Sequence, residues 1–315
     1  MSQKHLYGGQ AVIEGVMIRG KAYSSIAVRR PSGEIALKIE PLSKLFIGKL
    51  RQIPLVRGVM VLAETLVLGM RSLSYSASVA MDQEAQEMPK ATLAVMMVIS
   101  LAFAVGLFFM TPLLVVRSID SFISSSILSN FIEGAVRLAI FLIYIYLIGR
   151  MSEIRKVFAY HGAEHMTIHA RENGDPLEVA AVRKYSTAHP RCGTAFLLVV
   201  MIVAIIVFTF LGRPSMEWRI LSRIVLIPVI AAISYEVIRF SGVHSKNALV
   251  KLVTGPSLAL QRLTTRQPSD AQIEVAIAAV KEAIAADEGT TGESDLERQN
   301  MTQKVPTNTQ LPSKS

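Results

Sequence analysis

One stretch of the chain decides its fold: Thr194-Ala-Phe-Leu-Leu-Val-Val-Met-Ile-Val-Ala-Ile-Ile-Val-Phe-Thr-Phe-Leu211. A helix of this length crosses most of the roughly 30 Å hydrocarbon layer of a bilayer. Further apolar runs lie at residues 91–115, 131–149 and 220–238. A soluble chain rarely has 51% hydrophobic residues and a mean hydropathy of +0.42. The sequence therefore predicts a mainly α-helical, polytopic membrane protein with about four transmembrane helices.

Lysine and arginine residues alternate between rich and poor segments of the chain. Residues 1–90 carry 12, the 150–193 loop seven and residues 241–315 eight, whereas the 116–130 loop carries one and the 212–219 turn two. Cytoplasmic segments of membrane proteins are enriched in these residues, so we expect both termini and the 150–193 loop to be cytoplasmic. The lipid bilayer is then the main partner. Nucleic acid is not expected despite the net charge of +9, because the basic residues do not gather with aromatic residues on one stretch.

Four regions are expected along the chain. Residues 1–90 form a cytoplasmic N-terminal region, and residues 91–266 form the membrane domain with its histidine-rich loop. Residues 267–286 predict an amphipathic helix, capped by Ser269. Residues 287–315 are polar and predict a disordered tail.

The N-terminal region contains a glycine-punctuated segment and a strand pattern. The segment Gly8–Gly20 places Glu14 and Arg19 among apolar residues, which is typical of a turn or a ligand-cradling loop. Residues 25–30 and 34–39 alternate between apolar and polar positions around a Pro-Ser-Gly turn. This pattern predicts a small cytoplasmic β-hairpin.

Residues 55–70 are apolar but carry two charges, Arg57 and Glu64, on one helix face. A full transmembrane span is one interpretation of this segment. The charges and the short length favour an interfacial or re-entrant helix.

Three of the six histidines recur every fourth residue in the 150–193 loop: His161, His165 and His169. On a helix they share one face. The order His161-Gly-Ala-Glu164-His165 matches H-x-x-E-H, in which two imidazoles hold zinc and the carboxylate activates water. A polar helix face that happens to carry histidines is the simpler alternative. Because His161 and His169 are about 12 Å apart on a straight helix, only His161/His165 or His165/His169 can share an ion.

Further ligands must come from elsewhere in the chain. His189, Arg191 and the single cysteine, Cys192, immediately precede the third apolar run, near the same membrane surface. One cysteine excludes an internal disulfide and fits a ligand role. His244 and Glu236 lie at the inner end of the fourth run, where an ionisable residue is a functional candidate. We expect a divalent metal, zinc, bound by two stripe histidines and completed by His189, Cys192 or His244.

The first functional hypothesis is a metal-dependent hydrolase at the cytoplasmic membrane interface, with Glu164 as general base. Its substrate would be a membrane peptide or a lipid-linked molecule, because the site faces the headgroups. The alternative is a non-catalytic scaffold or regulator with a structural metal site. Ion transport is disfavoured because the intramembrane acids Glu133 and Glu236 lie near the ends of their runs.

Three blocks of sequence, at residues 8–19, 160–165 and 189–194, resemble the signature blocks of the YqhQ-like family. The similarity extends over roughly residues 5 to 285. This is a family of bacterial integral membrane proteins that are regarded as metal-dependent enzymes without an established reaction. The resemblance implies a multi-pass protein of the bacterial cytoplasmic membrane and the presence of a metal, and it supplies no substrate.

Overall fold

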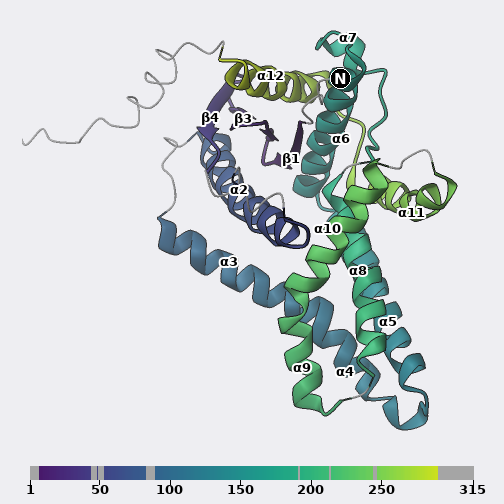
Figure 1. Cartoon of the computed structure of the whole chain (residues 1–315). Helices are drawn as coiled ribbons and strands as arrows, with labels where there is room; N and C mark the ends of the chain where they lie inside the picture. The colour runs from purple at the N-terminus through teal and green to yellow at the C-terminus, as the bar shows by residue number, and fades with distance from the viewer. Residues whose placement is uncertain are drawn as a thin grey trace, which may run out of the picture.

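The computed structural model describes residues 7–43, 48, 53–82, 89–190, 192–212, 214–243 and 247–289. The predictions for Arg191, His244 and residues 290–315 of the tail lie outside these residues. The chain is mainly helical, with one small sheet near its N-terminus (Figure 1). Its strands are β1 (Gly8–Val12), β2 (Gly15–Arg19), β3 (Tyr23–Arg29) and β4 (Ile35–Pro41). Its helices are α2 (Val56–Ala80), α3 (Lys90–Val105), η2 (Gly106–Met110), α4 (Thr111–Arg117), η3 (Asp120–Phe122), α5 (Ser126–Ile148), α6 (Ser152–Asn173), α7 (Val179–Val182), α8 (Gly193–Phe210), α9 (Met216–Val225), α10 (Ile227–Val243), α11 (Ala248–Thr264) and α12 (Asp270–Asp287).

The sheet has four antiparallel strands in the order β1-β2-β3-β4. The predicted hairpin is confirmed as β3–β4, with Val28 opposite Ala36. The glycine-punctuated segment, expected as a loop, is a second hairpin, β1–β2, whose two-residue turn places Glu14 at a positive φ of 49°. Its strand character is hidden in the sequence because β2 is buried on both faces, so apolar and polar positions do not alternate.

Three helices cover the two faces of the sheet, α6 and α12 on one face and α2 on the other. Val16 and Ile18 pack with residues of α6 and α12, whereas Met17 and Ile26 pack toward Val79 of α2. Helix α12 begins with a capping box in which Ser269 accepts from the backbone of Gln272 and the Gln272 side chain bonds back to Ser269. The sheet, α6 and α12 thus form one body at one end of the apolar helices (Figure 1).

Three helices are long and apolar enough to cross a membrane: residues 94–117, Ser126–Ile148 and Gly193–Phe210. A fourth span is present if α9 and α10, bent by 47° at their junction, are taken together. The bend lies where Pro228, the second residue of α10, cannot donate the backbone hydrogen bond that would continue α9. The described residues thus contain three or four helices that could cross a membrane, consistent with the predicted membrane protein of about four spans.

A cluster of buried charges lies at the far end of these helices from the sheet. Glu133 and Arg137, four residues apart on α5, form an ion pair in which Arg137 Nη2 donates to Glu133 Oε1 at 2.7 Å. Glu133 also accepts from Arg223 Nη2 at 2.8 Å, and the ring of Phe208 lies 4.3 Å from the Arg223 guanidinium. One carboxylate therefore ties α5 to α9 inside the apolar bundle.

Helix α2 is longer than the apolar run that predicted it, and it is not among the helices that pass for membrane spans. The two charges within residues 55–70 each have a partner. Arg57 pairs with Glu236 of α10, and Glu64 accepts from Arg19 Nε of β2 at 3.1 Å. Helix α2 therefore connects α10 with the sheet.

Helix α6 lies between β1, α12 and the start of α8, and ten of its residues are buried. It ends at Gly174, which has a left-handed φ of 80°. The segment that follows α11 crosses it, and the Arg266 backbone N–H donates to the Phe158 carbonyl at 2.9 Å. Helix α11 itself runs for 17 residues and buries Leu260 against α5 and α8.

Candidate metal centre

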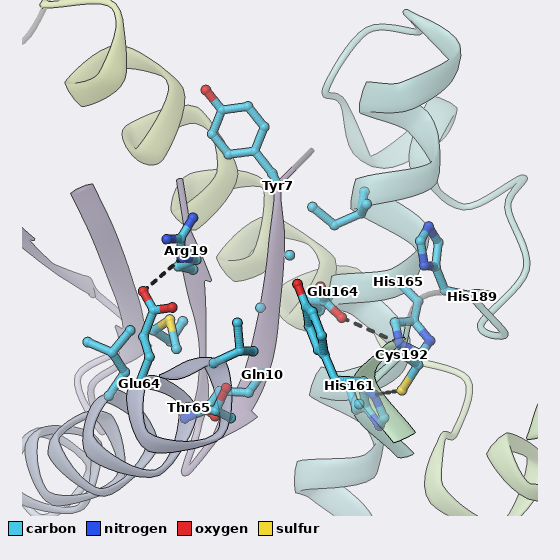
Figure 2. A pocket seen from close by; sticks show the side chains of 18 residues that line it. Tyr7, Gln10, Arg19, Glu64, Thr65, His161, Glu164, His165, His189 and Cys192 are labelled. Carbon is cyan, nitrogen blue, oxygen red and sulfur yellow. Dashed lines mark hydrogen bonds and ion pairs between the residues drawn. The ribbon is translucent and has the colours of Figure 1, made fainter. Parts of the chain in front are cut away.

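Two histidines of α6 and the cysteine before α8 converge. His161, His165 and Cys192 each present one ligand atom, and these atoms all lie within 4.8 Å of one another. The closest pair is His161 Nε2 and Cys192 Sγ, at 3.1 Å (Figure 2). Of the two histidine pairs that the spacing allowed, the structure brings His161/His165 to the thiol.

Backbone carbonyls fix the orientation of both rings. His161 Nδ1 lies 2.9 Å from the Thr264 carbonyl oxygen, and His165 Nδ1 lies 2.6 Å from that of Thr187. A carbonyl only accepts, so each Nδ1 carries the proton and each Nε2 keeps its lone pair. Metal-binding histidines commonly donate such a hydrogen bond from the ring nitrogen that does not bind the metal.

Gly162 makes the first of these contacts geometrically feasible. A Cβ at this position would lie 2.2 Å from the Arg266 carbonyl oxygen. The glycine between His161 and Ala163 therefore lets the segment after α11 cross α6 closely enough for Thr264 to reach His161.

Cys192 is the N-cap residue of α8. Its Sγ accepts from the Thr194 backbone N–H at 3.4 Å and lies 3.1 Å from Thr194 Oγ1. Helix N-termini favour negative charge and stabilise thiolates, the form of cysteine that binds metals. The buried thiol is thus held in an environment suited to a ligand.

Glu164 lies beside the histidines without joining their group. Its Oε2 is 3.5 Å from His165 Nε2, and the Gly9 backbone N–H donates to its carboxylate. Burial raises the pKa of Glu164 above its usual value, while the nearby His161 and His189 oppose that shift. The position is that of a proton acceptor next to the ligands.

These side chains line a cavity of about 360 Å³ between the sheet, α2 and α6. Across it from Glu164 lies the Arg19–Glu64 ion pair (Figure 2). Arg19 was a candidate site residue from the sequence. The other polar residues of the lining were not predicted as site residues, because no spacing within the sequence connects them to the histidines. These are Tyr7, Gln10, Glu64, Thr65 and Tyr235.

The remaining histidines of the described residues form a second group. His169, Glu172 and His189 also present ligand atoms within 4.8 Å of one another. His189, expected as a possible third ligand of the stripe pair, lies in this group and not with Cys192. Glu172, three residues after His169 on α6, is the member of this group that the sequence did not identify as a ligand.

Two other candidates lie outside both groups. Glu14 contacts Lys156 Nζ and the hydroxyl of Tyr160, each at 3.2 Å, and so joins the β1–β2 turn to α6. Glu236, a functional candidate from the sequence, instead accepts from Arg57 Nε at 2.6 Å. Its side chain forms an ion pair with Arg57 of α2 and does not line the cavity.

Comparison with known proteins places the chain in a family. The model of the family described as "Protein of unknown function (DUF1385)" matches residues 53–286. The chain belongs to this family. It is also 32% identical over 292 residues to the "Uncharacterized protein YqhQ" of Bacillus subtilis (strain 168), covering 88% of this chain and 92% of that protein. The expected YqhQ-like resemblance is confirmed. No solved structure matches the chain.

Proposed function

We propose that this DUF1385 protein is a metal-dependent hydrolase of the bacterial cytoplasmic membrane. The observation that carries the proposal is the placement of Glu164, whose carboxylate lies 3.5 Å from the lone-pair nitrogen of His165 and opens on the same cavity. A structural metal site does not require a buried proton acceptor that faces a cavity beside its ligands. A hydrolase needs a base at that place.

The donor set supports zinc. Two neutral imidazoles and one thiolate are ligands that zinc accepts, and three protein ligands leave a fourth position for water. The ion would lower the pKa of that water to about 7. In this arrangement His161, His165 and Cys192 hold the ion, Glu164 accepts the proton, and the Gly9 N–H keeps the carboxylate in place.

The location of the site suggests the substrate. Cys192 immediately precedes the first residue of α8, the most apolar span, so the cavity lies at the end of the membrane helices. The lysine and arginine distribution assigns this end, and both termini, to the cytoplasm. We propose a membrane peptide or a lipid-linked molecule as the substrate, because the bilayer holds such molecules at the membrane surface, where the cavity lies.

Glu164→Gln tests the proposal. The amide keeps the size of the side chain but cannot accept a proton, so the variant should retain its metal and its abundance and lose function. The control is Glu153→Gln on the same helix, whose side chain is 73% exposed. Complementation of a deletion strain provides the readout without a known substrate. Full complementation by a stable, metal-loaded Glu164→Gln protein would favour a scaffold or regulator with a structural metal.

A further inference from the structure

We infer that His169, Glu172 and His189 form a second, separate site for a divalent transition-metal ion. Their ligand atoms lie within 4.8 Å of one another, as close as those of His161, His165 and Cys192. Two imidazoles and one carboxylate form a donor set that binds zinc or iron and leaves further positions open. This inference does not depend on hydrolysis, because binding needs only the three side chains.

His169 is oriented as a ligand. Its Nε2 lies 2.9 Å from the Ala188 carbonyl oxygen, so Nε2 carries the proton and Nδ1 keeps the lone pair. The ring of Tyr185 stacks on it, with a centroid distance of 5.9 Å and an interplanar angle of 9°. The Tyr185 hydroxyl donates to Asp175 at 2.7 Å and so fixes the stacking partner.

His189 is held by its backbone. Its N–H donates to Gln261 Oε1 at 2.7 Å, and Gln261 Nε2 donates to its carbonyl at 2.9 Å. Gln261 is fully buried, so this reciprocal pair keeps the histidine in one position.

Glu172 supplies the negative charge of the second site. It follows His169 by three residues on α6 and therefore lies on the same helix face. Its Oε2 is 3.4 Å from His189 Nε2, and the His169 and His189 ring centroids are 4.4 Å apart. A carboxylate and two imidazoles thus converge from one helix and the 183–192 loop.

The second site adjoins the first and shares no ligand with it. The His165 and His189 ring centroids are 5.6 Å apart, and one face of α6 supplies two residues to each group. The four-residue repeat of the histidines explains this division, since His161 and His169 are too far apart to share an ion.

Metal counting tests the inference. The untagged full-length chain, purified in detergent and stripped with a chelator, is reloaded with zinc or cobalt(II), and the ions per chain are measured by mass spectrometry. We expect about two ions in the wild type and about one in His169→Ala and in Glu172→Gln. Glu153→Gln should keep both. With cobalt, the thiolate charge-transfer band reports only on the Cys192 group, so it should persist in His169→Ala and Glu172→Gln and disappear in Cys192→Ser.

A wild-type content of about one ion, or an unchanged content in Glu172→Gln, would overturn the second site. Retention of one ion by Cys192→Ser, together with two in the wild type, supports it even if substitution of His169 prevents folding. The hydrolase proposal is tested separately. It fails if Glu164→Gln still complements the deletion strain while its metal content is unchanged.

Discussion

The imidazole of His161 and the thiol of Cys192 lie 3.1 Å apart although 31 residues separate them. One residue comes from the middle of α6 and the other from the N-cap of α8. The contact therefore joins the helix next to the sheet to a helix of membrane-spanning length, and a metal ion held there would link the two parts of the molecule.

Substitution of this thiol should weaken metal binding. Cys192→Ser replaces a soft thiolate by a hydroxyl, and we expect the zinc affinity of the His161 group to fall by at least about tenfold, the lower end of what loss of even an outer-shell partner costs. Competition with a zinc chelator measures the affinity. Thr209→Ser, which alters a hydroxyl residue elsewhere on α8, is the control. Equal affinities in wild type and Cys192→Ser would remove the cysteine from the ligand set.

Gly162→Ala should destabilise the protein. Its Cβ would lie 2.2 Å from the Arg266 carbonyl oxygen, a backbone atom that cannot turn aside. We expect a loss of about 1–3 kcal/mol, typical of overpacking, and a weaker His161 site. Gly106→Ala, in another helix where an added Cβ has no atom within 4 Å, should instead be neutral or slightly stabilising. Thermal unfolding in detergent compares them, and equal midpoints for both variants would contradict the close crossing.

Glu133→Gln should be among the most damaging single substitutions. Glu133 is 1% exposed and accepts from Arg137 and Arg223, so its loss leaves buried guanidinium groups without their counter-charge. Removal of one partner of a buried pair costs about 3–5 kcal/mol. The midpoint of thermal unfolding should fall well below that of the exposed control, Glu153→Gln. A similar fall of the midpoint in Glu133→Gln and Glu153→Gln would mean that the buried carboxylate contributes little to stability.

The proposed topology predicts which sites are reachable from outside the cell. Phe122→Cys, in the loop before α5 where the side chain is 88% exposed, should react with a membrane-impermeant maleimide in intact cells. Asn173→Cys, at the exposed end of α6, should react only after permeabilisation. The native Cys192 is buried, so wild type provides a low background. The reverse labelling pattern would place the histidines outside the cell.

Local patterns in the sequence predicted the elements whose surroundings are simple. The apolar runs predicted the membrane-length helices. The alternation of apolar and polar residues predicted the β3–β4 hairpin, in which β4 has both a buried position, Ile39, and an exposed one, Leu37. The β1–β2 hairpin was missed because β2 is enclosed by helices on both faces, which removes the alternation on which the prediction depends.

The site was predicted in its residue types and not in its grouping. Helical spacing placed His161 and His165 together and separated His169 from His161, which the structure agrees with. The choice between Cys192 and His189 depends on how the loop before α8 folds, and Gln261, 69 to 72 positions away, sets that fold through the His189 backbone. Such contacts depend on packing between distant segments, so spacing in one sequence carries no signal for them.

The carbonyl of Thr264 and the side chain of Gln261 have a consequence for biosynthesis. Both belong to α11, which follows the last membrane-length segment of the chain. When the ribosome has completed α10, the chain already contains His161, His165 and Cys192, but nothing yet orients His161 or anchors the loop that carries His189. A nascent chain at that stage has metal-binding side chains without a formed centre. Binding of the proposed ion would therefore be delayed until synthesis has passed the final span and the remaining segment has folded back across α6.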